Sequence, residues 1–175
     1  MNKIIYFAAC LVIASCNNPQ QQLKKQIADE ENVLFADSNK TLAAPRAGEL
    51  LKLYVSYADQ FKDDSMSAEF LFKAGDLANN LHKPVEAIEL LGRVQEYKTY
   101  SKVPLALFLQ GFIAETELND LEHAKQYYET FLHKYPHHQL SNDVQASLNN
   151  LGKSPEELIR EFEANKREQD SIVTR

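Results

Sequence analysis

Apolar residues recur every three or four positions in the chain after residue 47, and not every two. Spacing of this kind places them on one face of an α-helix, whereas a half-buried strand alternates with period two. The 175 residues include only 5 glycines and 6 prolines, and no Asn-Gly or Asp-Gly pair marks a hairpin turn. The pattern therefore predicts an all-α fold of about seven helices.

Separate apolar stripes mark the individual helices at the two ends of this region. One stripe lies between Gly48 and Asp63, and another runs from Leu140 to Leu151 and is ended by Gly152. The run Ser154-Pro155-Glu156-Glu157 then predicts the start of a last helix, with an N-cap serine, a proline in the first position and a glutamate closing the capping box. We expect three apolar residues of this helix to face the core: Leu158, Ile159 and Phe162.

The centre of the chain repeats itself. Residues 71–78 and 107–114 share Leu, Phe, Gly and Ala at an offset of 36, and beyond a turn Ala87 matches Ala124 at an offset of 37. Each copy is predicted to be a helix, a short turn and a second helix. Glycine inside a helix costs about 1 kcal/mol relative to alanine. The glycine in each first helix therefore predicts a close approach of its partner helix, near these two alanines.

This pattern resembles the tetratricopeptide repeat. The matching residues are Ala74, Gly75, Ala87 and Leu91 in the first copy and Gly111, Ala124, Tyr128, Phe131 and Pro136 in the second. The chain departs from the family in its spacing, in having no tryptophan, and in having Thr99 where the first copy's proline would stand. The resemblance implies antiparallel hairpins stacked as a short right-handed solenoid over residues 47–167. It implies helix-packing positions at Gly75, Ala87, Gly111, Ala124, Tyr128 and Pro136.

The first sixteen residues have a different character. Lys3 precedes an apolar run over residues 4–13, which is about half as long as the roughly 20 residues that a membrane span needs. A positive start, a short apolar run and small residues are typical of a secretory signal. The ending Leu-Val-Ile-Ala-Ser-Cys at residues 11–16 resembles the lipobox of bacterial lipoproteins. This resemblance implies cleavage before Cys16 and acylation of Cys16.

The chain is thus predicted to have four parts. Residues 1–15 are a lipoprotein signal peptide, and residues 16–46 are the lipidated cysteine and a tether. Within the tether, the spacing of Leu23, Ile27, Val33, Leu34 and Phe35 allows one short helix that packs on the first hairpin. Residues 47–167 form the repeat domain. The polar residues 168–175 are expected to be a disordered tail, since chain ends that bury nothing fray.

Residues 127–162 also resemble envelope repeat proteins of Gram-negative bacteria. The similarity is carried by Phe-Leu-His-Lys-Tyr-Pro at residues 131–136 and by residues 148–159. Such proteins include the repeat lipoprotein of the outer-membrane β-barrel assembly machine and the periplasmic repeat protein of the Tol-Pal system. Asn17 stands where an aspartate often retains lipoproteins in the inner membrane. The resemblance therefore implies a lipid anchor in the outer membrane, facing the periplasm.

Composition and charge narrow the chemistry. A net charge of −6 argues against nucleic acid as a partner and against adhesion to anionic lipid by charge alone. Cys10 leaves with the signal and Cys16 is acylated, so no thiol remains for catalysis or metal binding. His133, His137 and His138 lack the further rigid ligands of a metal site, and we expect a solvated cluster at a helix end. No catalytic motif is present, so we expect no enzyme, no metal and no cofactor.

The expected function is a membrane-anchored scaffold for envelope proteins, with a role in outer-membrane assembly or maintenance. The alternative is a lipoprotein that binds a peptide or small molecule in the solenoid groove. Candidate residues on the concave face are Phe72, Asp76, Asn79, Phe108, Phe112 and Glu115. A known repeat subclass grips a terminal carboxylate with Lys and Asn where this chain has Phe72 and Asp76, so that clamp is not expected here.

Overall fold

The computed structural model describes residues 18–36 and 44–173. Within these residues it contains eight helices and no strand, which confirms the all-α fold and exceeds the expected number of helices by one. The helices are α1 (Pro19–Phe35), α2 (Ala44–Gln60), α3 (Ser65–Asn80), α4 (Pro84–Val94), α5 (Val103–Thr116), α6 (Leu121–Lys134), α7 (Ser141–Asn150) and α8 (Pro155–Val173). The predicted signal peptide and Cys16 lie outside the described residues. Among those residues, no helix is both long and apolar enough to cross a membrane.

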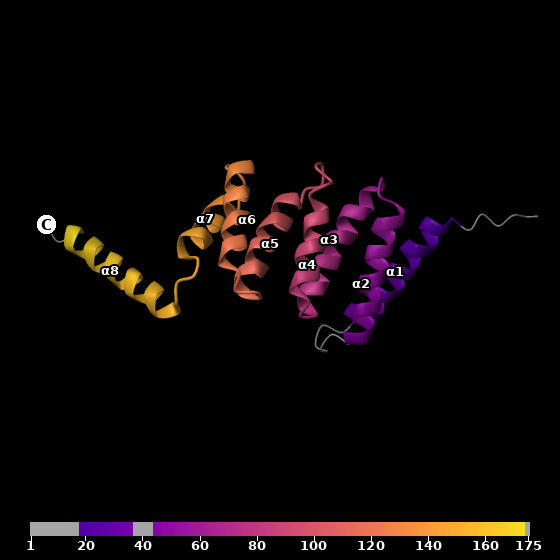
Figure 1. The fold of residues 1–175 in the computed structure, drawn as a ribbon, viewed down its shortest axis with the longest axis horizontal. Helices are drawn as coiled ribbons and strands as arrows, with labels where there is room; N and C mark the ends of the chain where they lie inside the picture. The colour runs from indigo at the N-terminus through magenta and orange to yellow at the C-terminus, as the bar shows by residue number, and fades with distance from the viewer. Residues whose placement is uncertain (1–17, 37–43, 174–175) are drawn as a thin grey trace, which may run out of the picture.

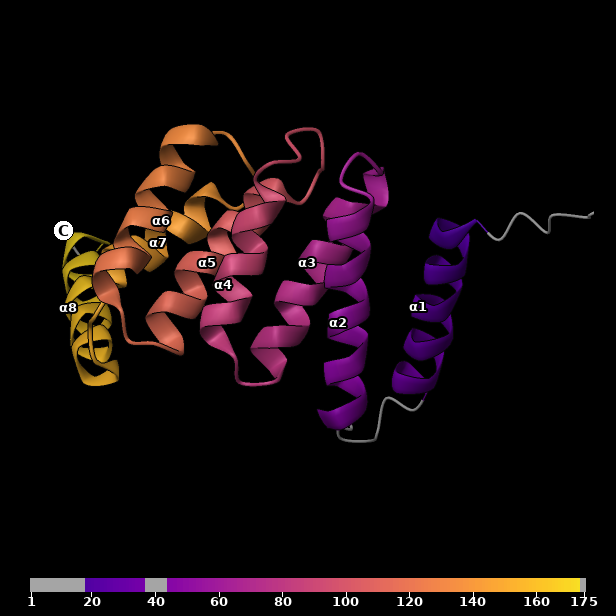
Figure 2. The same ribbon diagram turned by 45° about the vertical axis from the view of Figure 1, so that its right-hand side comes forward.

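The helices form an elongated row in the order of the sequence (Figures 1 and 2). From α1 to α7, each helix packs against the next one along the chain. Neighbours run in opposite directions, so the turns alternate between two long edges. The α2–α3, α4–α5 and α6–α7 turns share one edge, and the α3–α4 and α5–α6 turns share the other. The right-handed twist of a solenoid stays a prediction.

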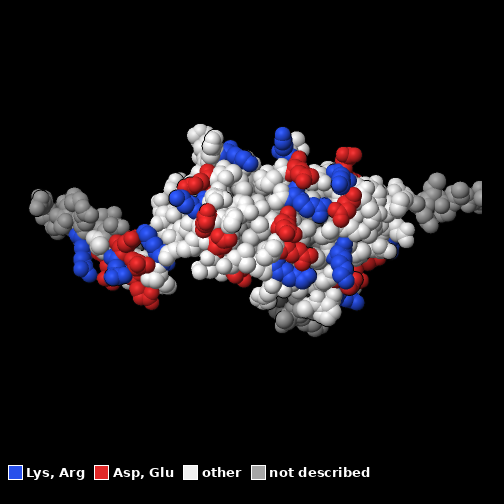
Figure 3. All heavy atoms as spheres, viewed as in Figure 1, with Lys and Arg blue, Asp and Glu red and all other residues white. Residues whose placement is uncertain are grey.

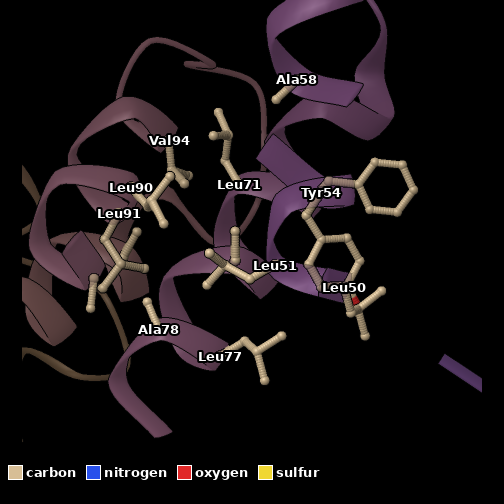
Figure 4. Packing of buried hydrophobic residues seen from close by; sticks show 14 of the residues in the cluster. Leu50, Leu51, Tyr54, Ala58, Leu71, Leu77, Ala78, Leu90, Leu91 and Val94 are labelled. Carbon is tan, nitrogen blue, oxygen red and sulfur yellow. The ribbon is translucent and has the colours of Figure 1, made fainter. Parts of the chain in front are cut away.

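The interior consists of two contiguous apolar clusters. The larger one joins α1 to α5, and the smaller one joins α5, α6 and α7. In the larger cluster, leucines of α2 and α3 meet Leu90, Leu91 and Val94 of α4 (Figure 4). Tyr57 is fully buried there, and its ring packs edge-on against Phe70 at 4.7 Å. The apolar stripes of the sequence thus meet in a continuous core.

The two glycines of the internal repeat lie where their partner helices come closest. A Cβ atom on Gly75 would lie 2.7 Å from Leu91 Cγ, and one on Gly111 would lie 2.7 Å from Tyr128 Cε1. Leu91 and Tyr128 are the residues that the repeat places at equivalent positions. Two further sets of equivalent positions are fully buried in both copies: Ala87 with Ala124, and Val94 with Phe131. The two hairpins therefore pack through the same contacts.

The segment predicted to be a tether with one short helix contains a longer helix, the 17-residue α1, which packs on α2. Asn18 caps α1 by accepting a hydrogen bond from the Gln20 backbone N–H at 3.0 Å, and Pro19 occupies the first turn. Glutamine and lysine favour helix, so the polar run continues it. Ile27 is 1% exposed against α2, and Lys24 pairs with Asp64 at 3.1 Å. The helical domain thus begins at α1, and α2 itself starts at Ala44, three residues before the predicted boundary.

The last helix also differs from the prediction. Leu158, Ile159 and Phe162 do not face the core, because they are 36%, 59% and 71% exposed. The reason lies in α7, which packs Val144 and Leu148 against α6 and leaves only polar residues and Ala146 on its outer side. The outer side of α7 therefore offers little apolar surface for α8 to cover.

Helix α8 continues to Val173, so most of the predicted disordered tail is helical. The segment contains no glycine or proline after Pro155, and Glu163 and Arg167 form an i,i+4 ion pair at 3.2 Å. Pairs of this spacing support a helix on its own surface. The local sequence therefore sustains the helix without help from the core.

The Asp64 cap of α3 provides a test of the α1–α3 contact. Its carboxylate accepts a hydrogen bond from the Met66 backbone N–H at 2.7 Å and one from Lys24 Nζ at 3.1 Å. Asp64→Ala should lower the free energy of unfolding by about 1–2 kcal/mol at pH 7, as loss of a cap does. The Met66 hydrogen bond, followed by Lys24, lowers the pKa of Asp64.

Because the pKa of Asp64 is lower in the folded state, the charge-dependent part of this stability is present above about pH 4. It is lost as the pH falls through the folded pKa. Urea unfolding followed by circular dichroism should therefore show a smaller difference between Asp64→Ala and the parent at about pH 3. Asp63→Ala is the matched control, since this exposed neighbour caps no helix. Equal costs for the two variants would contradict the role given to Asp64.

Candidate binding cleft on the face of α1 and α3

A cleft of about 470 Å³ opens between the C-terminal parts of α1 and α3, above the middle of α2. We call it the inner cleft. It is lined by Glu31, Asn32, Phe35, Ala36, Tyr54, Lys73, Asp76, Leu77 and Asn80. Its volume lies within the range of about 300–1,000 Å³ that is usual for ligand sites. Three successive helices build it, so its shape depends on how α1 docks.

A hydrogen-bonded group forms one wall of the inner cleft. The Tyr54 hydroxyl donates to Glu31 Oε1 at 2.6 Å, and Lys73 Nζ donates to the same oxygen at 2.8 Å. Burial, and then the bond to Glu31, raises the pKa of Tyr54 above its ordinary value, so the hydroxyl stays a donor at neutral pH. Lys73 also lies 5.9 Å from the centre of the Tyr54 ring. This group fixes α1 to both α2 and α3.

The other walls supply apolar surface and a carboxylate. Phe35 is 55% exposed at the end of α1, and Leu77 contributes an apolar side chain from α3. Asp76 is exposed and makes no ion pair with any residue that the structure describes. A ligand that brings an apolar side chain and a hydrogen-bond donor or a cation would find partners for each.

The same pairing of tyrosine and carboxylate recurs along the row of helices. The Tyr100 hydroxyl donates to Glu69, which also pairs with Lys102 at 3.3 Å. In the second repeat copy, the Tyr128 hydroxyl donates to Glu115 Oε2 at 2.7 Å. Burial is the main cause that raises the pKa of both tyrosines, which remain donors. The first bond joins α3 to the α4–α5 turn and the second joins α5 to α6, and both leave the carboxylates engaged.

The six residues predicted on the concave face have different roles. Only Asp76 lines the inner cleft. Phe72 packs against the Tyr100 ring and lies under Lys102, whose Nζ is 4.9 Å from the ring centre. Phe108 and Phe112 pack on each other, and Phe108 also packs on Tyr128. Asn79 has a buried Oδ1 atom that finds no hydrogen-bond partner among the described residues.

Sequence reasoning missed the part of the site that α1 contributes. Glu31 and Asn32 were assigned only to a tether, Phe35 was assigned to a short helix without a role in a site, and Tyr54 was counted only as a residue of an apolar stripe. The spacing of Leu23, Ile27, Val33, Leu34 and Phe35 predicted a short helix that packs on the first hairpin. Of these residues, Leu23, Ile27 and Leu34 contact the larger core cluster.

Two titratable residues considered in the sequence, His138 and Glu157, have structural roles. His138 Nδ1 accepts a hydrogen bond from the Leu140 backbone N–H at 3.2 Å, and its ring packs on Phe131. Ser154 and Glu157 form the predicted capping box, with bonds of 2.8 and 3.2 Å. In the part of the chain that the structure describes, no group of three or more His, Cys, Asp or Glu residues is placed to hold a metal ion.

A comparison of the chain with models of known protein families finds no match, and a comparison with curated proteins finds none. The resemblances to the tetratricopeptide repeat and to bacterial lipoproteins therefore stay predictions from the sequence.

Proposed function

We propose that the protein is a membrane-anchored lipoprotein that serves as a scaffold for protein–protein interaction in the cell envelope. In this proposal Cys16 is acylated and holds the chain at the outer membrane, facing the periplasm. The partner is an envelope protein that takes part in assembling or maintaining that membrane. The support from the sequence is the lipobox-like ending at residues 11–16 and the helical repeat.

The structural observation that supports a binding role is the inner cleft. Its polar wall is fixed by the hydrogen bonds among Glu31, Tyr54 and Lys73, so the site is formed before a partner arrives. Phe35 presents an apolar ring at the rim, and Asp76 presents a carboxylate. A segment of a partner protein could place an apolar side chain on the ring and a basic or amide group at the carboxylate. Preformed sites of this kind lose little free energy to ordering on binding.

Site-specific crosslinking in intact cells tests this function. A photoreactive residue at Asn32 or Asn80, both in the inner cleft, should give a protein adduct of one defined mass. The same residue at Glu122, which is exposed on α6 away from the cleft, is the matched control. Phe35→Ala should weaken the adduct about tenfold, which corresponds to about 1.4 kcal/mol of binding free energy.

The outcomes separate the proposed function from its alternative. Cys16→Ser should release the protein from the membrane fraction if Cys16 carries the anchor. A small molecule that copurifies with the protein, without a protein adduct at either cleft position, would favour the small-molecule alternative, which the cleft volume also permits. Equal labelling at Asn32, Asn80 and Glu122 would contradict a binding role for the inner cleft.

A further inference from the structure

The start of α1 places the proposed anchor at one edge of the domain. Pro19, the first residue of α1, is three residues from Cys16, and three residues span at most about 10 Å. The first turns of α1 are bound to the α2–α3 turn. The Gln20 side chain donates to the Tyr57 hydroxyl at 3.0 Å and to the Asp64 carboxylate, and Lys24 pairs with Asp64. An acyl group on Cys16 would therefore emerge beside this turn.

The α2–α3 turn belongs to the long edge that also holds the α4–α5 and α6–α7 turns (Figure 1). We call this the turn edge, made of residues 61–64, 95–102 and 135–140. Three exposed lysines lie in or directly beside these turns, one at each: Lys62, Lys98 and Lys134. None of them forms an ion pair with a residue that the structure describes.

Aromatic side chains accompany the lysines along the turn edge. Phe61, Tyr97, Tyr100 and Tyr135 are half-buried there. Tyrosine and lysine both combine an apolar body with a polar end, which suits the boundary between headgroups and water. Two exposed acids, Asp63 and Glu96, share the edge, and Figure 3 shows basic atoms beside acidic ones along the upper rim. The edge is thus only weakly basic, so it can orient an anchored domain but would not recruit a free one.

We infer that the turn edge rests on the anionic headgroups of the membrane that holds Cys16. This inference rests on the proposed function, because it requires the acylated cysteine. Helix α1 then acts as a rigid spacer. Its 17 residues rise about 25 Å from the edge to the inner cleft at its other end. The cleft would open away from the bilayer, where a partner can reach it.

Fluorescence quenching in liposomes tests the inference with the acylated chain that begins at Cys16. Single cysteines carrying a fluorophore are placed on the turn edge by Asp63→Cys, Thr99→Cys and His137→Cys. Lys83→Cys and Glu117→Cys place them on the opposite edge, and all five positions are exposed. The liposomes contain phosphatidylethanolamine, phosphatidylglycerol and a lipid with a nitroxide on its headgroup. The three turn-edge probes should lose most of their fluorescence, and the two opposite probes should keep most of theirs.

A charge-reversal variant separates orientation from attachment. Replacing all three turn-edge lysines (Lys62→Glu, Lys98→Glu and Lys134→Glu) should reduce quenching at Thr99→Cys while the protein still floats with the liposomes. The matched control reverses three lysines elsewhere (Lys52→Glu, Lys83→Glu and Lys125→Glu) and should leave the quenching unchanged.

The other outcomes contradict either the membrane contact of the turn edge or the acylated anchor. Quenching at Asp63→Cys alone would mean that only the α1 end of the row contacts the membrane. Equal quenching at all five sites would mean that the domain has no fixed orientation on the membrane. Either result overturns the inference and leaves the anchor intact. If the protein does not float with the liposomes, the proposal that Cys16 is an acylated anchor is contradicted. The inference that the turn edge contacts the membrane is then contradicted as well.

Discussion

Replacing Phe131 with alanine should lower the free energy of unfolding by about 3–5 kcal/mol, the usual cost of removing a buried phenylalanine. The ring is 0% exposed in the smaller core cluster. It meets the Tyr135 ring at 5.5 Å and the His138 ring at 5.6 Å, both edge-on. Its loss would leave a cavity where α5, α6 and α7 meet. Urea unfolding followed by circular dichroism measures the change.

Phe162→Ala is the matched control, with the same atoms removed from a ring that is 71% exposed on α8. Its effect on the unfolding of the row should stay within about 0.5 kcal/mol, as for most surface substitutions. A large cost for Phe162→Ala would mean that α8 packs on the domain in solution. A small cost for Phe131→Ala would contradict the joined core of α5, α6 and α7.

This pair of phenylalanines shows where periodicity could predict burial and where it could not. Both lie on apolar faces with helical spacing, and the sequence alone predicts that both are buried. What separates them is the outer side of α7, where Gln145 bonds to Asn149 at 2.9 Å and offers α8 no apolar partner. Whether a face is covered depends on a neighbour, and the pattern within one helix does not contain that neighbour.

The inner cleft could not be predicted from the sequence for a related reason. Its polar wall joins Glu31, Tyr54 and Lys73, which come from three helices and are up to 42 residues apart. No local motif links them. The low-complexity glutamines before Leu23 also favoured a tether, although an Asn18 cap and a proline in the first turn suffice to start a helix there.

Replacing Gly111 with valine should lower the free energy of unfolding by about 3 kcal/mol, at the upper end of the cost of overpacking a core. A Cβ atom at this position would lie 2.7 Å from Tyr128 Cε1, 2.9 Å from Tyr128 Cδ1 and 3.1 Å from Tyr127 Cβ. The Tyr128 ring is fully buried and its hydroxyl is bound to Glu115, so it has little freedom to move aside. Gly75→Val should behave alike, because its Cβ would meet buried Leu91 at the equivalent position of the first repeat copy.

Gly48→Val is the matched control within the same fold. This glycine also lies inside a helix, but a Cβ atom there would meet no atom of the described residues within 4 Å. Valine has a slightly higher helix propensity than glycine, so the change should stay within about 0.5 kcal/mol. Urea unfolding of the three variants then separates two explanations of glycine in a repeat. A similar result for all three would mean that the glycines reflect local backbone preference only. A loss confined to Gly75→Val and Gly111→Val would show that the two hairpins depend on the same close contact between their helices, as the repeat in the sequence predicts.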